Sequence, residues 1–138
     1  MSEKSRSILA DTSVWIEFFK QNSGTGDALE TLILEDAVWT CGVVLFELAQ
    51  GVKSDNEKLQ VLATLSHLKY VEMSKALWQK AGDLSASLRK KGQTLPHSDI
   101  FIAVIAIEHN LSIFTLDGHF KDIPGVKLHK AVSRASAL

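Results

Sequence analysis

Short apolar runs alternate with longer segments of helical periodicity along the chain. The first run, residues 7–10, lacks polar alternation, which is typical of a strand buried on both faces of a parallel sheet. These runs predict strands at residues 7–10, 37–41, 70–72, 112–115 and 126–129. Between the strands, apolar residues recur at helical spacing, and polar caps or glycines mark the segment ends. These segments predict helices from 12 or 13 to 20, from 27 onward, at 43–50, at 55–67, from 75 to the stop at Gly92, and at 99–109.

Residues 99–109 carry the most apolar segment, and its type decides the fold class. The unbroken run 100–107 would suit a buried strand, but Ser98 as an N-cap and Asn110 as a stop favour a buried helix. Strands and helices then alternate throughout, as in βαβ units. We therefore predict one domain over 1–138, a three-layer α/β/α fold around a mostly parallel sheet of about five strands. The ends, 1–6 and 130–138, are interpreted as a flexible leader and a tail.

Composition narrows the classes of protein that fit this pattern. Hydrophobic residues make up 46% of the chain and charged residues 22%, which excludes a disordered protein. The 15 basic residues do not exceed the 16 acidic ones, so a polyanion partner would have to be held locally. The longest apolar stretch is far shorter than the roughly 20 residues that span a bilayer. One cysteine, Cys41, cannot form an internal disulfide, and the expected location is the cytoplasm.

Four acidic residues fall where parallel sheets bind ligands, beyond the carboxyl ends of the strands. Asp11 follows the first predicted strand, Asp117 follows the fourth, and Asp99 lies in the first turn of the apolar helix. Glu47 stands in a strongly apolar helix, where a carboxylate is unusual. Asp11, Asp99 and Asp117 each have an ordinary explanation, as an N-cap, a helix-dipole partner and a turn residue. Their joint placement with Glu47 at one edge of the sheet indicates a ligand-binding site.

Gathering carboxylates at one place requires a compensating positive charge. Burying even one carboxylate costs several kcal/mol. Neighbouring carboxylates also drive their pKa values apart unless a cation lies between them. Oxygen ligation suits Mg²⁺ or Mn²⁺, and Mg²⁺ typically binds one or two carboxylates together with substrate phosphates. Because such a metal activates a bound water, no serine or histidine nucleophile is needed. The acids therefore predict metal-dependent hydrolysis of phosphodiesters.

The residues around the acids resemble the PIN-domain ribonucleases, and more closely the VapC-type toxins of prokaryotic toxin–antitoxin modules. The resemblance spans residues 8–120, and its motifs follow one another in the same order as in the family. Each of the four motifs is loose, but the four together are fairly specific. These motifs are Ile8–Ile16 (ILADTSVWI), Phe46–Gly51 (FELAQG), Ser98–Ala103 (SDIFIA) and Thr115–Phe120 (TLDGHF).

The resemblance implies an Mg²⁺-dependent endoribonuclease, with Mn²⁺ as the other candidate cation. Its four acids map onto Asp11, Glu47, Asp99 and Asp117. Asp11 and Asp99 would be the main metal ligands. Glu47 and Asp117 would complete the cluster directly or through water.

The resemblance also implies supporting residues and partners. Ser13 or Thr115 would orient a ligand or a water through its hydroxyl group. Many relatives carry a further acid two residues after the fourth, where this chain has His119. Such toxins inhibit translation by cleaving RNA, with tRNA or rRNA the expected substrate. They usually form homodimers, and a VapB-type antitoxin neutralises them by inserting its C-terminal segment beside the active site.

Other functions share parts of this pattern. A PIN-domain nuclease that processes RNA outside any toxin–antitoxin pair fits the same motifs, and so does a PIN-like binding module without activity. The presence of all four acids argues against the binding module. A receiver domain needs an acidic pair after its first strand, and a haloacid-dehalogenase-type phosphatase needs Asp-x-Asp where this chain has Asp11-Thr12-Ser13.

The four acids of the predicted site also change the meaning of the charge balance. Without them, 12 of the 16 acidic residues remain against 15 basic ones, so the rest of the chain is mildly basic, as a polyanion partner requires.

Overall fold

The computed structural model describes residues 7–20 and 22–130, and it confirms the predicted α/β architecture. Five strands form one sheet in the order β3-β2-β1-β4-β5, and every pairing is parallel. The strands are β1 (Ile8–Ala10), β2 (Val38–Cys41), β3 (Lys69–Val71), β4 (Ser112–Phe114) and β5 (Lys127–Leu128). The predicted leader, and all of the predicted tail but Lys130, lie outside the described residues.

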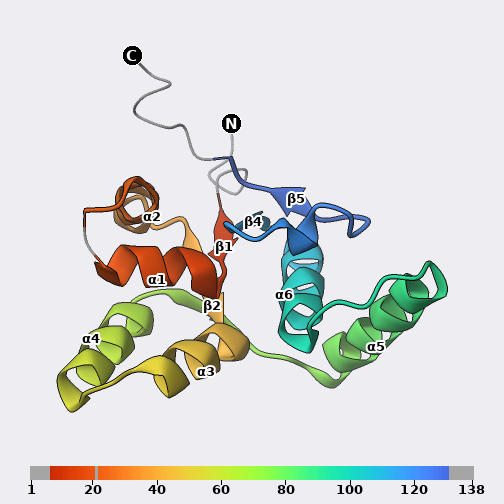
Figure 1. The fold of residues 1–138 in the computed structure, drawn as a ribbon, viewed down its shortest axis with the longest axis horizontal. Helices are drawn as coiled ribbons and strands as arrows, with labels where there is room; N and C mark the ends of the chain where they lie inside the picture. Colours follow the sequence, from red (N-terminus) through yellow and green to blue (C-terminus); the bar gives the residue numbers. More distant parts are fainter. Residues whose placement is uncertain (1–6, 21, 131–138) are drawn as a thin grey trace.

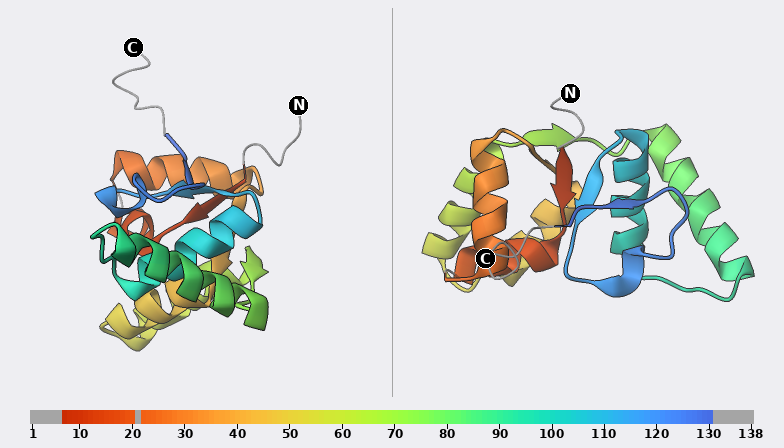
Figure 2. Two further views of the ribbon diagram at one scale, coloured as in Figure 1. Left: turned by 90° about the vertical axis from the view of Figure 1, so that its right-hand side faces the viewer. Right: turned by 90° about the horizontal axis from the view of Figure 1, so that it is seen from above.

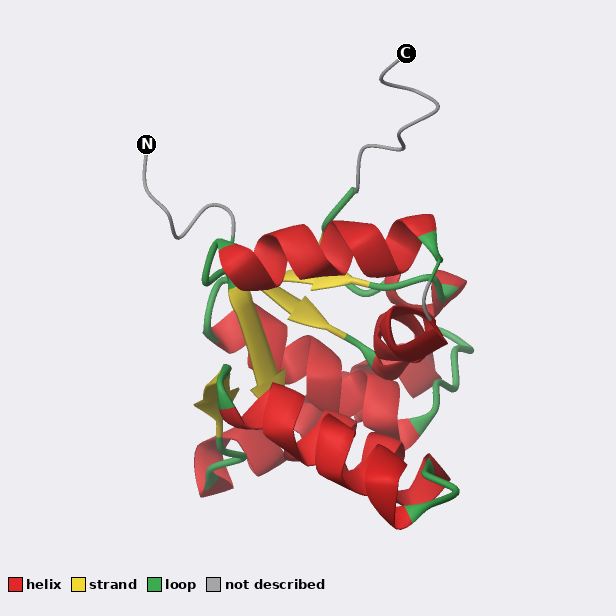
Figure 3. Cartoon of the chain, turned by 90° about the vertical axis from the view of Figure 1, so that its left-hand side faces the viewer, coloured by secondary structure: helices red, strands yellow, loops and turns green. Residues whose placement is uncertain are grey.

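Helices cover the sheet on both sides, which gives the three layers. They are α1 (Thr12–Lys20), α2 (Gly24–Leu34), α3 (Gly42–Gly51), α4 (Asp55–Ser66), α5 (Lys75–Lys90) and α6 (His97–Glu108), with a short 3₁₀ helix, η2 (Gly118–Phe120). Figure 1 and the right-hand view of Figure 2 show α1 and α2 on one side of β1, and α5 and α6 on the other. Figure 3 shows the strands enclosed between helices. Among the described residues, no helix is long and apolar enough to cross a membrane.

The central strand β1 sets the position of the site. It pairs with β2 through Ile8 and Val38, and with β4 through Ile8 and Ser112. All three residues of β1 are fully buried, because helices cover both of its faces. This burial explains why the run has no polar alternation. Since β1 and β4 are parallel neighbours, the residues that follow them emerge side by side at the carboxyl edge.

Helix α6 confirms that the most apolar run is a helix rather than a strand. Seven of its residues are buried, from Asp99 through Ala106. It begins at His97 with Pro96 as its N-cap residue, so the prediction that Ser98 caps it was wrong by two positions. The fixed φ of proline suits a helix start, and Pro96 needs no amide hydrogen there. Asp99 nevertheless remains in the first turn, as predicted.

Helix α2 begins earlier than its sequence pattern predicts. Ser23 is the N-cap and accepts a hydrogen bond from the Gly26 amide, whereas we expected Asp27 to cap the helix. The glycine-rich segment before residue 27 therefore forms the first turn of α2. Gly26 is buried against α1, where an added Cβ would lie 3.0 Å from the Cα of Phe18 and 3.1 Å from the carbonyl oxygen of Glu17. The absence of a side chain lets the two helix backbones approach.

We expect Gly26→Ala to lower the free energy of unfolding by about 1–3 kcal/mol, because the added methyl forces α1 and α2 apart. Gly82 is the matched control, since an added Cβ there meets no heavy atom within 4 Å outside its own helix. Gly82→Ala should raise stability by about 0.5–1 kcal/mol through a less flexible unfolded chain. Urea unfolding of both variants measures the difference. A Gly26→Ala protein as stable as wild type would contradict the close packing of the two helices.

Candidate metal centre

Asp11 is a buried carboxylate held by hydrogen bonds on both of its oxygens. It lies directly after β1, is only 5% exposed, and its backbone amide donates to the Phe114 carbonyl of β4 at 3.0 Å. One carboxylate oxygen, Oδ1, accepts from the Ser13 amide at 3.0 Å, from the Ser13 hydroxyl, and from the Val14 amide at 3.4 Å. The other, Oδ2, accepts from the Thr115 hydroxyl. Asp11 therefore does act as a cap for α1, but half of its carboxylate faces the end of β4.

Ser13 and Thr115 connect Asp11 to the segment that follows β4. The Ser13 hydroxyl also accepts from the Leu116 amide at 3.1 Å, and the Thr115 hydroxyl accepts from the Asp117 amide at 2.9 Å. Each hydroxyl therefore joins a carboxylate oxygen of Asp11 to the backbone of this segment. Ser13 and Thr115, which the resemblance singles out, thus both donate hydrogen bonds to Asp11 in this structure.

Asp99 is the second buried carboxylate, at 8% exposure in the first turn of α6. Its Oδ2 lies 2.7 Å from Nδ1 of His119, on η2. The same ring nitrogen lies 3.1 Å from Oδ2 of Asp117. Ligand atoms of Asp99, Asp117 and His119 all fall within 4.8 Å of one another, and no other described residues form such a group of three.

Burial and mutual repulsion make this edge unfavourable for negative charge. Desolvation raises the pKa of Asp11 above its ordinary value, even though hydrogen bonds from Ser13 and Thr115 act in the opposite direction. The pKa of Asp99 is raised chiefly by burial, and further by the neighbouring charges of Asp117 and Asp11. The hydrogen bond to Asp99 raises the pKa of His119. The protein thus gathers carboxylates where a positive charge is favoured, which is the electrostatic requirement for a bound cation.

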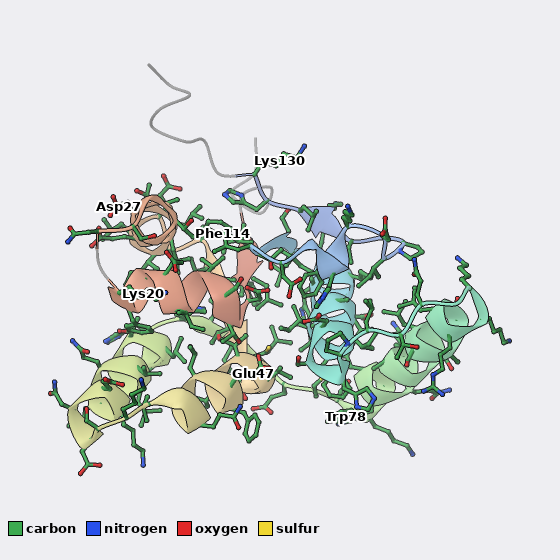
Figure 4. All side chains as sticks on the ribbon, viewed as in Figure 1. Lys20, Asp27, Glu47, Trp78, Phe114 and Lys130 are labelled. Atoms are coloured by element: carbon green, nitrogen blue, oxygen red, sulfur yellow. The ribbon has the colours of Figure 1, made fainter. Side chains whose placement is uncertain are left out.

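Glu47 stands apart from the other acids among the described residues. It is half-buried on α3, and its Oε1 accepts a hydrogen bond from the Thr12 hydroxyl at 2.6 Å. Figure 4 shows it on α3, close beneath α1. Thr12 follows Asp11 directly in the chain, so this bond places Glu47 beside the acidic edge without bringing it into the group of three. The polar partner explains how a carboxylate is tolerated in an apolar helix.

Two residues of this edge carry roles that the sequence pattern did not assign. His119, noted only as a departure from the family pattern, is the residue that bridges Asp99 and Asp117. Thr12, considered only as a helix cap, is the hydrogen-bond partner of Glu47. The spacing of Asp117 and His119 offered one signal, because an aspartate side chain often bonds a backbone amide two residues on. That bond is present at 3.1 Å.

The donor set at this edge fits a divalent cation. It consists of carboxylate oxygens and one imidazole nitrogen, at the carboxyl end of a parallel sheet. An α/β protein with an acidic, metal-compatible centre is the class that these features describe. The model of the PIN domain family matches residues 8–126, and the chain belongs to this family.

Characterised relatives and solved structures extend the comparison over nearly the whole chain. Ribonuclease VapC11 of Mycobacterium tuberculosis H37Rv is 28% identical over 132 residues, covering 91% of this chain and 98% of its own length. The structure of VapBC2 from Rickettsia felis bound to a promoter DNA fragment matches with a TM-score of 0.73 and 26% identity, covering 91% and 98%. DNA-bound VapBC from Salmonella typhimurium matches the fold with a TM-score of 0.74 at 22% identity, covering 89% and 96%.

We expect Asp11→Asn to stabilise the metal-free protein near neutral pH by on the order of 1 kcal/mol, because it removes a buried charge while retaining an acceptor oxygen. The raised pKa means that folding favours the protonated carboxyl. The wild type therefore loses stability as the pH rises through the pKa of Asp11 in the folded protein. The difference in stability between wild type and Asp11→Asn should disappear as the pH falls toward 3.8, the ordinary pKa of an aspartate.

Denaturant unfolding in chelator-containing buffer across this pH range measures the effect. Asp83→Asn, which changes an exposed aspartate on α5, is the control and should leave stability unchanged. An Asp11→Asn protein that is less stable than wild type near neutral pH would contradict the unfavourable burial of this charge.

Proposed function

We propose that the protein is a metal-dependent endoribonuclease that acts as the toxin of a VapBC-type toxin–antitoxin module. The observation that carries the proposal is the pair of buried carboxylates, Asp11 and Asp99, at the carboxyl edge of the sheet. The characterised relatives are named as VapC ribonucleases, and the structural neighbours are VapBC complexes. The tRNA or rRNA substrates expected of such a toxin would place its action in the cytoplasm.

The chain's own residues supply binding and orientation for this chemistry. A bound divalent cation would polarise the scissile phosphoryl oxygen and lower the pKa of a water. Asp11 and Asp99 would hold the cation through carboxylate oxygens. Ser13 and Thr115 keep the Asp11 carboxylate in one orientation, as their hydrogen bonds indicate.

We infer Mg²⁺ as the working cation, with Mn²⁺ as the alternative. Carboxylate oxygens suit both ions, and Mg²⁺ commonly completes its coordination with substrate phosphates and water. Asp117 and Glu47 would complete the binding of the cation from the periphery of the site, directly or through water. Glu47 is the more remote of the two, because its oxygen is bonded to Thr12.

An apolar groove beside the acids supports the proposed antitoxin partner. It has a volume of about 490 Å³, lies between α1, α3 and α4, and is bounded at one side by Thr12 and Glu47. Its wall includes Phe19 and the 46% exposed Ile16. Lys20, Glu47 and Glu57 add charges of both signs. This groove is the site that we assign to the C-terminal segment of a VapB-type antitoxin. The homodimer implied by the family resemblance stays a prediction.

A nuclease that processes RNA outside a toxin–antitoxin pair is the second candidate. It would use the same acids and would leave the apolar groove to another purpose. A binding module without activity has less support, because the four acids are retained and Asp11 and Asp99 are buried at an electrostatic cost. Functional carboxylates explain such a cost better than a scaffold does.

We expect Asp99→Asn to reduce metal-dependent cleavage of RNA by 100-fold or more, on the order of the loss of a main metal ligand. Asp83→Asn keeps the same chemical change on the exposed face of α5 and should cleave at the wild-type rate. Cleavage of total cellular RNA by each purified protein, with Mg²⁺ or with chelator, is the measurement. Equal cleavage by wild type and Asp99→Asn would refute the assignment of the metal site.

Expression in a bacterial host tests the toxin role separately from the chemistry. Induction of the wild-type protein alone should arrest growth, because RNA cleavage inhibits translation. Asp11→Asn expressed at the same level should relieve the arrest, and so should co-expression of the adjacent antitoxin gene. Normal growth with the wild-type protein at a confirmed expression level would favour the second candidate.

A further inference from the structure

The side chain of His119 occupies the acidic edge in a way that an ordinary surface histidine does not. Its Nδ1 lies 2.7 Å from Oδ2 of Asp99 and 3.1 Å from Oδ2 of Asp117. The His119 side chain is 47% exposed, so solvent reaches the imidazole although its Nδ1 faces the carboxylates. One imidazole nitrogen and two carboxylate oxygens thus converge from α6 and from η2.

The backbone of η2 fixes this arrangement. Asp117 is the N-cap of η2, and its Oδ1 accepts from the His119 amide at 3.1 Å, which leaves Oδ2 facing the imidazole ring. The next residue, Phe120, is fully buried and anchors the short helix in the core. Behind Asp117, its own amide donates to the Thr115 hydroxyl. The nitrogen is therefore presented by an anchored turn rather than by a free surface loop.

A nitrogen donor changes which cation the three ligands favour. Carboxylate oxygen is a suitable ligand type for both Mg²⁺ and Mn²⁺, so it does not distinguish the two ions. Imidazole nitrogen, in contrast, is a ligand of first-row transition ions. Mg²⁺ binds oxygen and gives up its water reluctantly. A set of two carboxylates and one imidazole is common chemistry for a transition-metal ion.

We propose that His119 is a metal ligand through Nδ1, and that with Asp99 and Asp117 it forms a mixed nitrogen and oxygen half of the centre that selects Mn²⁺ or a related transition ion over Mg²⁺. The inference rests on the proposed metal site, and it adds a residue and a selectivity that the acids alone do not supply. Asp11 lies outside this group of three, and Asp99 is the residue that the group shares with the carboxylate pair to which we assign Mg²⁺.

Electron spin echo spectroscopy of bound Mn²⁺ tests the proposal without reference to RNA cleavage. The purified full-length protein is loaded with less than one equivalent of Mn²⁺. The expected result is a modulation from a directly coordinated ¹⁴N nucleus. His119→Gln should abolish that modulation, and His67→Gln should keep it, because His67 is an exposed histidine at the end of α4.

The second readout is competition between Mn²⁺ and Mg²⁺ for the protein, measured through the signal of free Mn²⁺. His119→Asp converts the group to oxygen ligands only, so its preference for Mn²⁺ over Mg²⁺ should fall roughly tenfold or more. Circular dichroism of each variant checks that it is folded before binding is compared.

Each outcome is decisive. A wild-type Mn²⁺ signal without ¹⁴N modulation, or modulation that survives in His119→Gln, would show that His119 is only a hydrogen-bond donor and would overturn the proposal. An unchanged Mn²⁺ preference in His119→Asp would also overturn it. Neither result would affect the nuclease proposal, which instead fails if Asp99→Asn cleaves RNA as wild type does.

Discussion

Asp11 and Asp99 are almost withdrawn from solvent at the same edge of the sheet, and burying these two carboxylates has an electrostatic cost. Hydrogen bonds from Ser13, Val14 and Thr115 satisfy the Asp11 oxygens, yet desolvation still raises the pKa of its carboxyl. Hydrogen bonds alone therefore do not compensate for the buried charge. The His119 imidazole offsets part of it at Asp99. A divalent cation from solution is the natural complement of this buried negative charge.

The parallel sheet explains how residues so distant in the chain reach one edge. Asp11 and Thr115 follow β1 and β4, which are hydrogen-bonded neighbours, so their side chains meet although 104 positions separate them. Asp99 approaches from the first turn of α6, where the helix dipole also favours a negative charge. Packing of α1 against α3 then brings Glu47 to Thr12. Asp11, Asp99 and Thr115 thus stand at element ends, where the backbone fixes their positions, whereas Glu47 reaches this edge from the middle of α3.

Much of this arrangement could be predicted from the sequence, for physical reasons that particular residues illustrate. The run at β1 had to be buried on both faces, so the aspartate after it had to emerge at the carboxyl edge. The start of α2 was mistaken because Ser23 and Asp27 are both good caps, and only the contact of Gly26 with α1 decides between them. The bridging position of His119 and the bond from Thr12 to Glu47 were not predictable, because both depend on how separate elements pack. Sequence motifs therefore singled out the four acids, whereas the contacts that each acid makes became visible only in the three-dimensional structure.

Anomalous diffraction from crystals grown with Mn²⁺ shows whether the acidic edge binds a divalent cation. We expect an anomalous peak at the manganese absorption edge, bounded by the carboxylates of Asp11 and Asp99. The peak should vanish in Asp99→Asn crystals grown under the same conditions. Wild-type crystals without a peak at this position, at a Mn²⁺ concentration that supports RNA cleavage, would show that the acidic edge is not a metal site.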